Sequence, residues 1–247
     1  MPAVSLHTYI VALPENHIDS LHDHNITAAI TVDIPYTSSY GLYLSINNDD
    51  SFIETRISQL HPYALISPDQ PYTWQVNRSV LLTSPGINTK FLNISSTAEL
   101  VVTLTYMSYI NEFEFSSDTI LLSSTGTLST YYVIETGAVA SPQLLYYSDV
   151  RELPNSLSYI VVMATDDGVT DVKLKFPHRE FDIQAMFEDM TICVPRTMNS
   201  SLEQFQSLFL RFKQDVSGTL VTSTKKIAVF AGTITVCALL FPSSSTL

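Results

Sequence analysis

The sequence predicts an all-β protein made of two tandem antiparallel β-sandwich-like units. Residues suited to pleated sheets are abundant, chiefly Tyr, Phe, Thr, Ser, Val and Ile. Strand-like apolar runs recur at intervals of about ten residues, a spacing typical of sandwiches and barrels. Glycine is scarce, at 7 residues, so the turns between these runs depend on Pro, Asn, Asp and Ser.

The predicted strands follow one another along the whole chain. In the first half they are Thr8–Leu13, Ile26–Ile34, Gly41–Ile46, Phe52–Ile57, Tyr72–Val76, Val80–Thr83 and Glu99–Tyr109. In the second half they are Thr119–Leu122, Tyr131–Glu135, Leu144–Tyr147, Tyr159–Ala164, Val169–Phe176 and Thr191–Val194.

The stretch from Gly218 to Gly232 predicts two short strands joined by a turn at Lys225 and Lys226. The apolar run Ile227–Phe241 holds only about 15 residues, whereas a membrane-spanning helix needs roughly 20. Buried strands are therefore favoured over a tail anchor.

One helix is considered, around Phe181–Met190 or Leu202–Phe212. In the second segment the apolar residues fall at helical spacing, but they also alternate imperfectly as a strand would. Both interpretations remain open.

A faint internal repeat predicts where the two units meet. Leu6–Leu13 parallels Ser129–Thr136, and two further pairs of segments follow in the same order. We predict a first unit over 1–118 and a second over 119–247, with a joint near residues 117–128.

Charge and motif content exclude several classes of function. There are 24 acidic against 12 basic residues, a formal charge of −12, which repels phosphate backbones and argues against a nucleic-acid partner. The six histidines show no metal-ligand spacing, and no catalytic or phosphate-binding motif is present. No catalytic residue, metal site or cofactor is predicted. The acidic segments at 47–50 and 166–168 are compatible with calcium loops and equally with ordinary hairpin turns.

Four acceptor sequons for N-glycosylation are present, at Asn25, Asn77, Asn93 and Asn199. In an exported chain we expect at least two of them to be used.

The two cysteines, Cys193 and Cys237, both fall in the second unit. In an exported chain they would pair and stabilise the fold by roughly 3–4 kcal/mol. The alternative is two buried free thiols that pack as small apolar groups.

Four segments carry a resemblance to a known family: Tyr9–Asn16, Ser129–Thr136, Tyr159–Leu174 and Gly218–Gly232, followed by Cys237. Together they resemble the IgGFc-binding protein N-terminal domain family, in which Tyr159–Leu174 corresponds to a strand–turn–strand hairpin. None of these motifs is catalytic. The resemblance implies a recognition module, but it identifies no residue that contacts Fc.

The leading hypothesis is a non-catalytic extracellular adhesion or recognition module that binds a protein or glycan partner and has no membrane span. Met1–Leu13 lacks the features of a signal peptide, which leaves an intracellular protein or a fragment of a longer secreted chain. Because the opening strand of the family pattern begins almost at Met1, we expect a fragment. The alternatives are a β-sandwich hydrolase acting on glycans and a structural surface protein.

Overall fold

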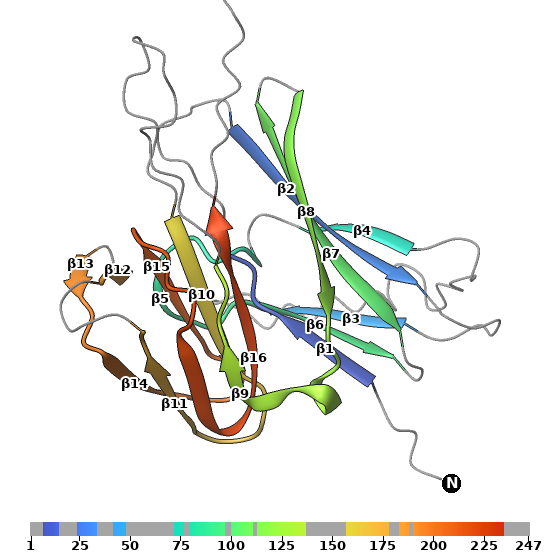
Figure 1. Ribbon diagram of the computed structural model, residues 1–247. Coiled ribbons are helices and arrows are strands. Elements are labelled where there is room, and N and C mark those ends of the chain that lie inside the picture. Colours follow the sequence, from blue (N-terminus) through green and yellow to red (C-terminus); the bar gives the residue numbers. More distant parts are fainter. Residues whose placement is uncertain are drawn as a thin grey trace, which may run out of the picture.

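A computed structural model describes residues 7–14, 24–33, 42–47, 72–76, 80–96, 100–110, 113–136, 157–177, 183–187 and 190–234. Within them the chain forms three antiparallel sheets (Figure 1). The prediction of an all-β fold is confirmed. The predicted strands Phe52–Ile57 and Leu144–Tyr147 lie outside the described residues, and Val80–Thr83 contributes only an isolated bridge between Leu82 and Pro14.

Two smaller sheets from the first half of the chain pack face to face. One has the order β1 (His7–Val11), β6 (Phe91–Ser96), β3 (Leu42–Asn47). The other has the order β4 (Tyr72–Val76), β2 (His24–Asp33), β7 (Val101–Ile110), β8 (Phe113–Leu122). A buried cluster fills the space between them, with members from both sheets such as Val11, Ile30, Leu92 and Leu104. This part is a β-sandwich.

The second half forms a single nine-stranded sheet. Its main order is β13 (Met190–Cys193), β12 (Gln184–Phe187), β15 (Ser207–Phe212), β10 (Leu157–Ala164), β16 (Leu220–Ile234), β11 (Thr170–Lys175), β14 (Thr197–Leu202). Two further strands join it: β5 (Gly86–Asn88) pairs with β15, and β9 (Ser129–Val133) pairs with β16. A 3-10 turn, η3 (Thr125–Thr127), lies between β8 and β9.

The long strand β16 pairs in turn with two strands along one edge. Its C-terminal part lies opposite β10, from Ile227 at Ala164 onward. Its N-terminal part lies opposite β11, from Ser223 at Val172 to Leu220 at Lys175. β10 and β11 therefore lie end to end along the same edge of β16, which is hydrogen-bonded to both. The predicted hairpin over Tyr159–Leu174 and the prediction of two short closing strands are both wrong.

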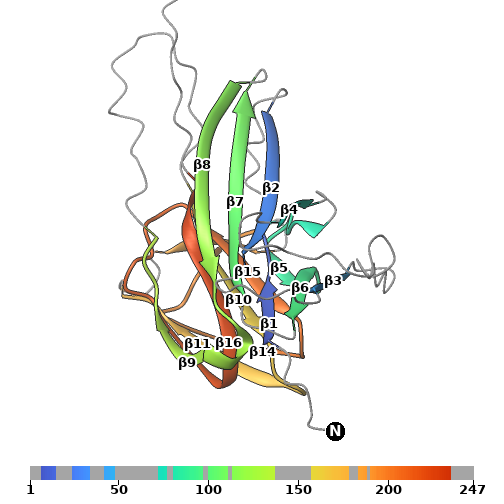
Figure 2. The ribbon, with the colours of Figure 1, turned by 90° about the vertical axis from the view of Figure 1, so that its right-hand side faces the viewer.

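Two segments between strands, at residues 165–169 and 203–206, lie beside residues 223–226 of the continuous strand β16, where its register with β9 shifts. We call this row of three segments the crease. The N–H of Phe205 donates to the carbonyl of Ala164 at 2.8 Å, and Thr165 Oγ1 donates to the carbonyl of Lys226 at 3.0 Å. Gly168 has a φ of 73°, which glycine adopts without steric cost. The segment 166–168 is therefore a bend, and β11 and β14 lie below β10 and β15 in Figure 2.

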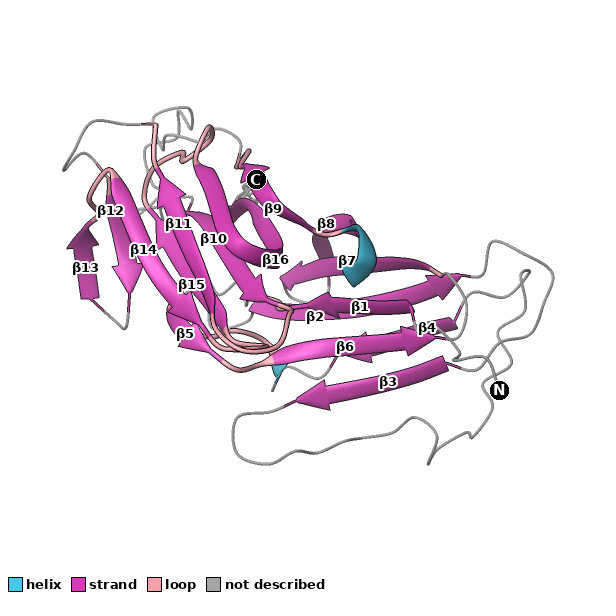
Figure 3. Cartoon of the chain, turned by 90° about the horizontal axis from the view of Figure 1, so that it is seen from below, coloured by secondary structure: helices cyan, strands magenta, loops and turns pink. Residues whose placement is uncertain are grey.

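The sheet curls around its own core. One cluster of buried residues includes Val172 and Leu174 on one side of the crease and Ile160, Leu208 and Phe212 on the other. A second cluster covers the opposite face of β10, β15 and β16 and joins the two halves of the chain. Its members are Ile10, Ala12, Leu82, Phe91, Tyr159, Val161, Met163, Phe209 and Ala228. Figure 3 shows β10 and β15 beside β1 and β6.

Burial on both faces accounts for the helix-like spacing of apolar residues in Leu202–Phe212. All six residues of β15 are buried, so apolar side chains occur on both sides and period-two alternation is hidden. The segment is two strands, β14 ending at Leu202 and β15, separated by residues 203–206. The alternative helix at Phe181–Met190 is also wrong, since β12 and the start of β13 occupy its described residues.

The division of the chain at residue 118 remains a prediction. Residue 118 lies inside β8, where Asp118 pairs with Tyr106 of β7. The chain leaves the four-stranded sheet after Leu122 and enters the nine-stranded sheet at Ser129.

Candidate functional site

Beyond the crease, four strands present an open sheet face. β9, β16, β11 and β14 lie side by side, as the bottom left of Figure 1 shows. β11 alternates without exception between buried and exposed residues, because its even-numbered residues enter the core. Its odd-numbered residues, with their partners on the other three strands, form what we call the outer face.

The register places the outer-face residues in two complete rows across the sheet. The first row is Tyr131, Thr222, Lys173 and Asn199. The second row is Val133, Leu220, Lys175 and Thr197. Since side chains on one face of a sheet stand about 5 Å apart across strands and about 7 Å apart along them, neighbouring members of these rows can share one ligand.

Tyr131 and Val133 form the apolar border of the outer face. Tyr131 is 56% exposed and Val133 is 63% exposed. Tyr132, between them, points the other way: it packs against the core, and its hydroxyl donates to the carbonyl of Ile227 at 2.8 Å. This inward anchor fixes the alternation and so holds Tyr131 toward solvent.

Lys173 and Lys175 form the cationic centre of the outer face. Both are exposed, and neither makes an ion pair in the part of the chain that the structure describes. Their neighbours across the strands are the neutral residues of the two rows. The acid nearest along the strand, Asp171, accepts a hydrogen bond from Ser201 Oγ at 2.7 Å. The two ammonium groups therefore remain available to a ligand.

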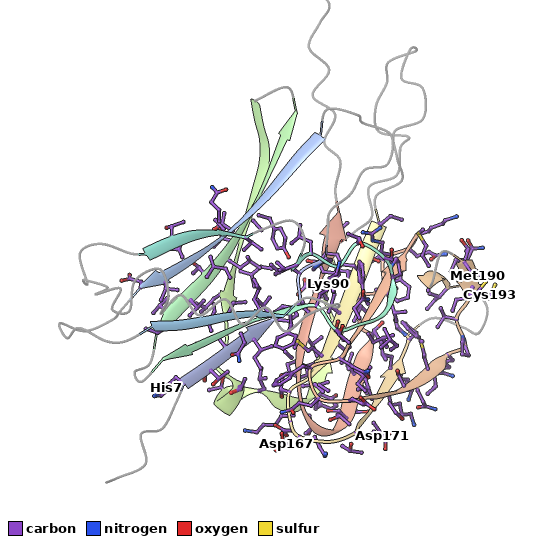
Figure 4. All side chains as sticks on the ribbon, turned by 180° about the vertical axis from the view of Figure 1, so that it is seen from behind. His7, Lys90, Asp167, Asp171, Met190 and Cys193 are labelled. Atoms are coloured by element: carbon purple, nitrogen blue, oxygen red, sulfur yellow. The ribbon has the colours of Figure 1, made fainter. Side chains whose placement is uncertain are left out.

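The lysines at the crease are used differently. Lys225 Nζ donates to the carbonyl of Asp167, and Lys226 Nζ donates to the carbonyl of Gly126 at 2.8 Å. The backbone N–H of Lys226 also donates to Asp166 Oδ2 at 3.3 Å. These contacts hold the bend and the link to β9 in place, so Lys225 and Lys226 have a structural role. Figure 4 shows Asp167 and Asp171 at this end of the molecule.

The edge of β9 is partly satisfied from within the strand. The N–H of Tyr131 donates to Ser129 Oγ at 3.2 Å, and the N–H of Ser129 donates to the hydroxyl of Tyr132 at 2.8 Å. A peptide strand added to a sheet edge depends on such backbone donors. This arrangement favours a ligand on the face of the sheet over one on its edge.

Three of the four predicted glycosylation sites lie on described strands, each on a different one. Asn199 is exposed on β14 and belongs to the first row of the outer face. Asn93 is only half-buried but lies on β6, the central strand between β1 and β3. Asn25 lies on β2, and its side chain is not among those described. Asn77 lies outside the described residues, and glycosylation at all four sites stays a prediction.

The cysteine pair also stays a prediction. Cys193 is an exposed free thiol on β13 and lies with Met190 at the margin of the sheet in Figure 4. Cys237 lies outside the described residues. Three strands separate β13 from β16, which corresponds to about 19 Å across a flat sheet. The three residues from Ile234 to Cys237 span at most about 11 Å. A bridge, which needs Cα atoms within about 7 Å, therefore requires the curl of the sheet.

Two further observations concern the described residues alone. No group of three or more His, Cys, Asp or Glu side chains is arranged to hold a metal ion there. No helix in this part of the chain has the length and apolar character needed to cross a membrane.

The sequence interpretation did not single out Tyr131, Lys173 or Lys175. The signal was present at residues 171–175, where charged and apolar residues alternate strictly. Alternation predicts an exposed face, but the identity of the neighbouring strands depends on the long-range pairing of β11 with β14 and β16.

Comparison with known proteins supports a family relationship for this half of the chain. A family model described as IgGFc binding protein matches residues 117–246, more than half of the sequence. The matched segment includes all four strands of the outer face. No curated protein and no solved structure matches the chain.

Proposed function

The chain belongs to the IgGFc-binding protein family, and from that premise we propose that it is a non-catalytic extracellular recognition module. The observation that carries the proposal is the outer face, which lies in the family-matched segment and combines an exposed aromatic ring with two lysines that make no ion pair among the described residues. Such a face recognises a protein or glycan partner by its side chains.

The rigidity of the scaffold supports this role. The inward-facing partners of the outer-face residues, such as Val172, Leu174 and Val221, are no more than 1% exposed. A surface held by a packed core loses little conformational freedom when it binds, so more of the contact energy is retained as affinity.

The compartment is tested by expression of the chain behind a signal peptide in cultured cells, followed by intact-mass analysis of the medium. The proposal expects folded protein in the medium with added carbohydrate mass. Retention of the chain in an unmodified, misfolded form would contradict an extracellular role.

Recognition is tested with the secreted full chain carrying Asn199→Gln, which leaves the outer face without a glycan, against immobilised extracellular proteins and glycans. The family name makes the Fc fragment of IgG the first protein to test, with the Fab fragment as its control. A partner of the outer face should bind at least about tenfold more weakly to a Thr222→Tyr variant, which adds bulk at the centre of the face.

The matched control for this substitution is Thr105→Tyr. Thr105 lies on the solvent-facing side of the four-stranded sheet, where its hydroxyl is 3.1 Å from that of Thr119. Both substitutions replace a strand threonine by the same larger residue. Equal affinity in the two variants would exclude the outer face as the recognition surface.

A further inference from the structure

We propose that the outer face binds an acidic oligosaccharide, with Lys173 and Lys175 contacting its carboxylate or sulfate groups and Tyr131 stacking on a sugar ring. This inference deepens the proposed recognition function and rests on it. The argument proceeds from the charge of the face, its size and the polar groups around it.

Charge complementarity identifies an anionic ligand. The chain as a whole is strongly acidic, yet two exposed lysines stand on the same side of β11, two residues apart, without an ion pair in the described structure. Their cross-strand neighbours Thr222 and Leu220 are neutral. The two ammonium groups repel each other. A ligand with closely spaced negative charges offsets this repulsion, so such a ligand is favoured.

The polar surroundings favour a saccharide. Asn199 and Thr197 lie beside the lysines on β14, and Thr222 lies between Lys173 and Tyr131. Amide and hydroxyl side chains both donate and accept hydrogen bonds, which matches the hydroxyl groups of a sugar. Tyr131 supplies a large exposed aromatic surface at the end of the same row.

The size of the face argues against a protein partner at this surface. Four strands span about 14 Å, whereas a typical protein interface buries about 800 Å² on each partner around an apolar core. The apolar side chains here lie only toward the β9 border, and two backbone N–H groups of that strand are already bonded to side chains. An acidic peptide added as a strand is therefore the less favoured occupant.

The experiment uses the full chain in an Asn199→Gln background, so that no carbohydrate of the protein itself occupies the first row. The probes are a heparin-derived hexasaccharide, a hyaluronan hexasaccharide, neutral maltohexaose and a short polyglutamate peptide. Affinities are measured by calorimetry at low and at physiological salt. We expect at least one acidic hexasaccharide to bind, with weaker binding at the higher salt, and maltohexaose not to bind.

Charge variants locate the site. The double variant Lys173→Glu/Lys175→Glu should weaken binding at least about tenfold, as should Lys173→Gln/Lys175→Gln, which avoids introducing acids. The control, Lys90→Glu/Lys213→Glu, makes the same change in net charge away from the outer face and should stay within about twofold. Tyr131→Ala should weaken binding, whereas Tyr131→Phe should retain it.

Three results would overturn the inference. An equal loss in the control double variant would show a non-specific charge effect. Polyglutamate binding with the affinity and lysine dependence of the saccharide would identify an acidic protein partner instead. If neither acidic hexasaccharide binds, while the chain still binds another extracellular partner, an acidic saccharide is excluded as the ligand of the outer face. The proposed recognition function would remain.

Discussion

The ring of Tyr159 on β10 lies over Gly232 on β16, and the two residues are direct cross-strand partners. A Cβ atom at position 232 would stand 2.9 Å from Tyr159 Oη and 3.1 Å from two of its ring carbons. Tyr159 is only 7% exposed and packs in the cluster that joins the two halves of the chain. The absence of a side chain at Gly232 therefore allows an aromatic ring to fill the space.

We predict that Gly232→Ala destabilises the protein by about 1–3 kcal/mol, because the buried ring must move to admit the methyl group. Chemical denaturation measures the effect. Gly126→Ala is the control, since a Cβ there would have its nearest neighbour, Ser124 Oγ, at 3.8 Å. The cost of Gly232→Ala should fall in a Tyr159→Ala background, and an unchanged cost would contradict the contact.

A second prediction concerns Phe205, which lies in the crease with a φ of 66° and stacks on Phe91 with ring centroids 4.7 Å apart. Left-handed backbone costs a residue with a Cβ about 1 kcal/mol, whereas glycine adopts it freely. Both Phe205→Ala and Phe205→Gly lose the stacking. We expect the glycine variant to be the more stable of the two.

The order should reverse at Leu128, which packs against the same cluster but has a φ of −64°. There Leu128→Ala should be more stable than Leu128→Gly, because glycine only adds freedom to the unfolded chain. The four melting curves form one comparison. If the alanine variant is more stable than the glycine variant at both positions, the backbone at Phe205 is not strained.

A third prediction is that Asn199 is glycosylated in the secreted chain and Asn93 is not. Asn199 is exposed on β14, while Asn93 lies half-buried on the central strand of its sheet, where a glycan would disturb the pairing with β1 and β3. In chain made through the secretory route, Asn199→Gln should remove the mass of one glycan and Asn93→Gln should remove none. A glycan recovered on Asn93 in folded protein would contradict the assignment.

A fourth prediction retains the bridge between Cys193 and Cys237 in the secreted chain. Non-reducing peptide mapping should recover one linked pair, and reduction should lower the melting temperature. The control is Cys193→Ser, whose melting temperature should not respond to reductant. If alkylation modifies both thiols in freshly secreted, folded protein, the two cysteines are unpaired.

The sequence by itself determined the all-β class, the positions of most strands and the family relationship. These follow from local information: β-branched and aromatic residues, turn residues between them, and short strand motifs such as the one ending at Gly232. The alternation in Thr170–Lys175 also marked which side chains face solvent, because adjacent residues of a strand point to opposite faces.

Tertiary structure alone decided how the strands pair and where the candidate site lies. The placement of β16 between β9 and the line formed by β10 and β11 depends on hydrogen bonds between residues far apart in sequence. β15 did not show its strand character because both of its faces are buried, by two different cores. Tyr131, Lys173 and Asn199 come from three separate segments of the sequence. Only the register of three long-range strand pairings places them in one row.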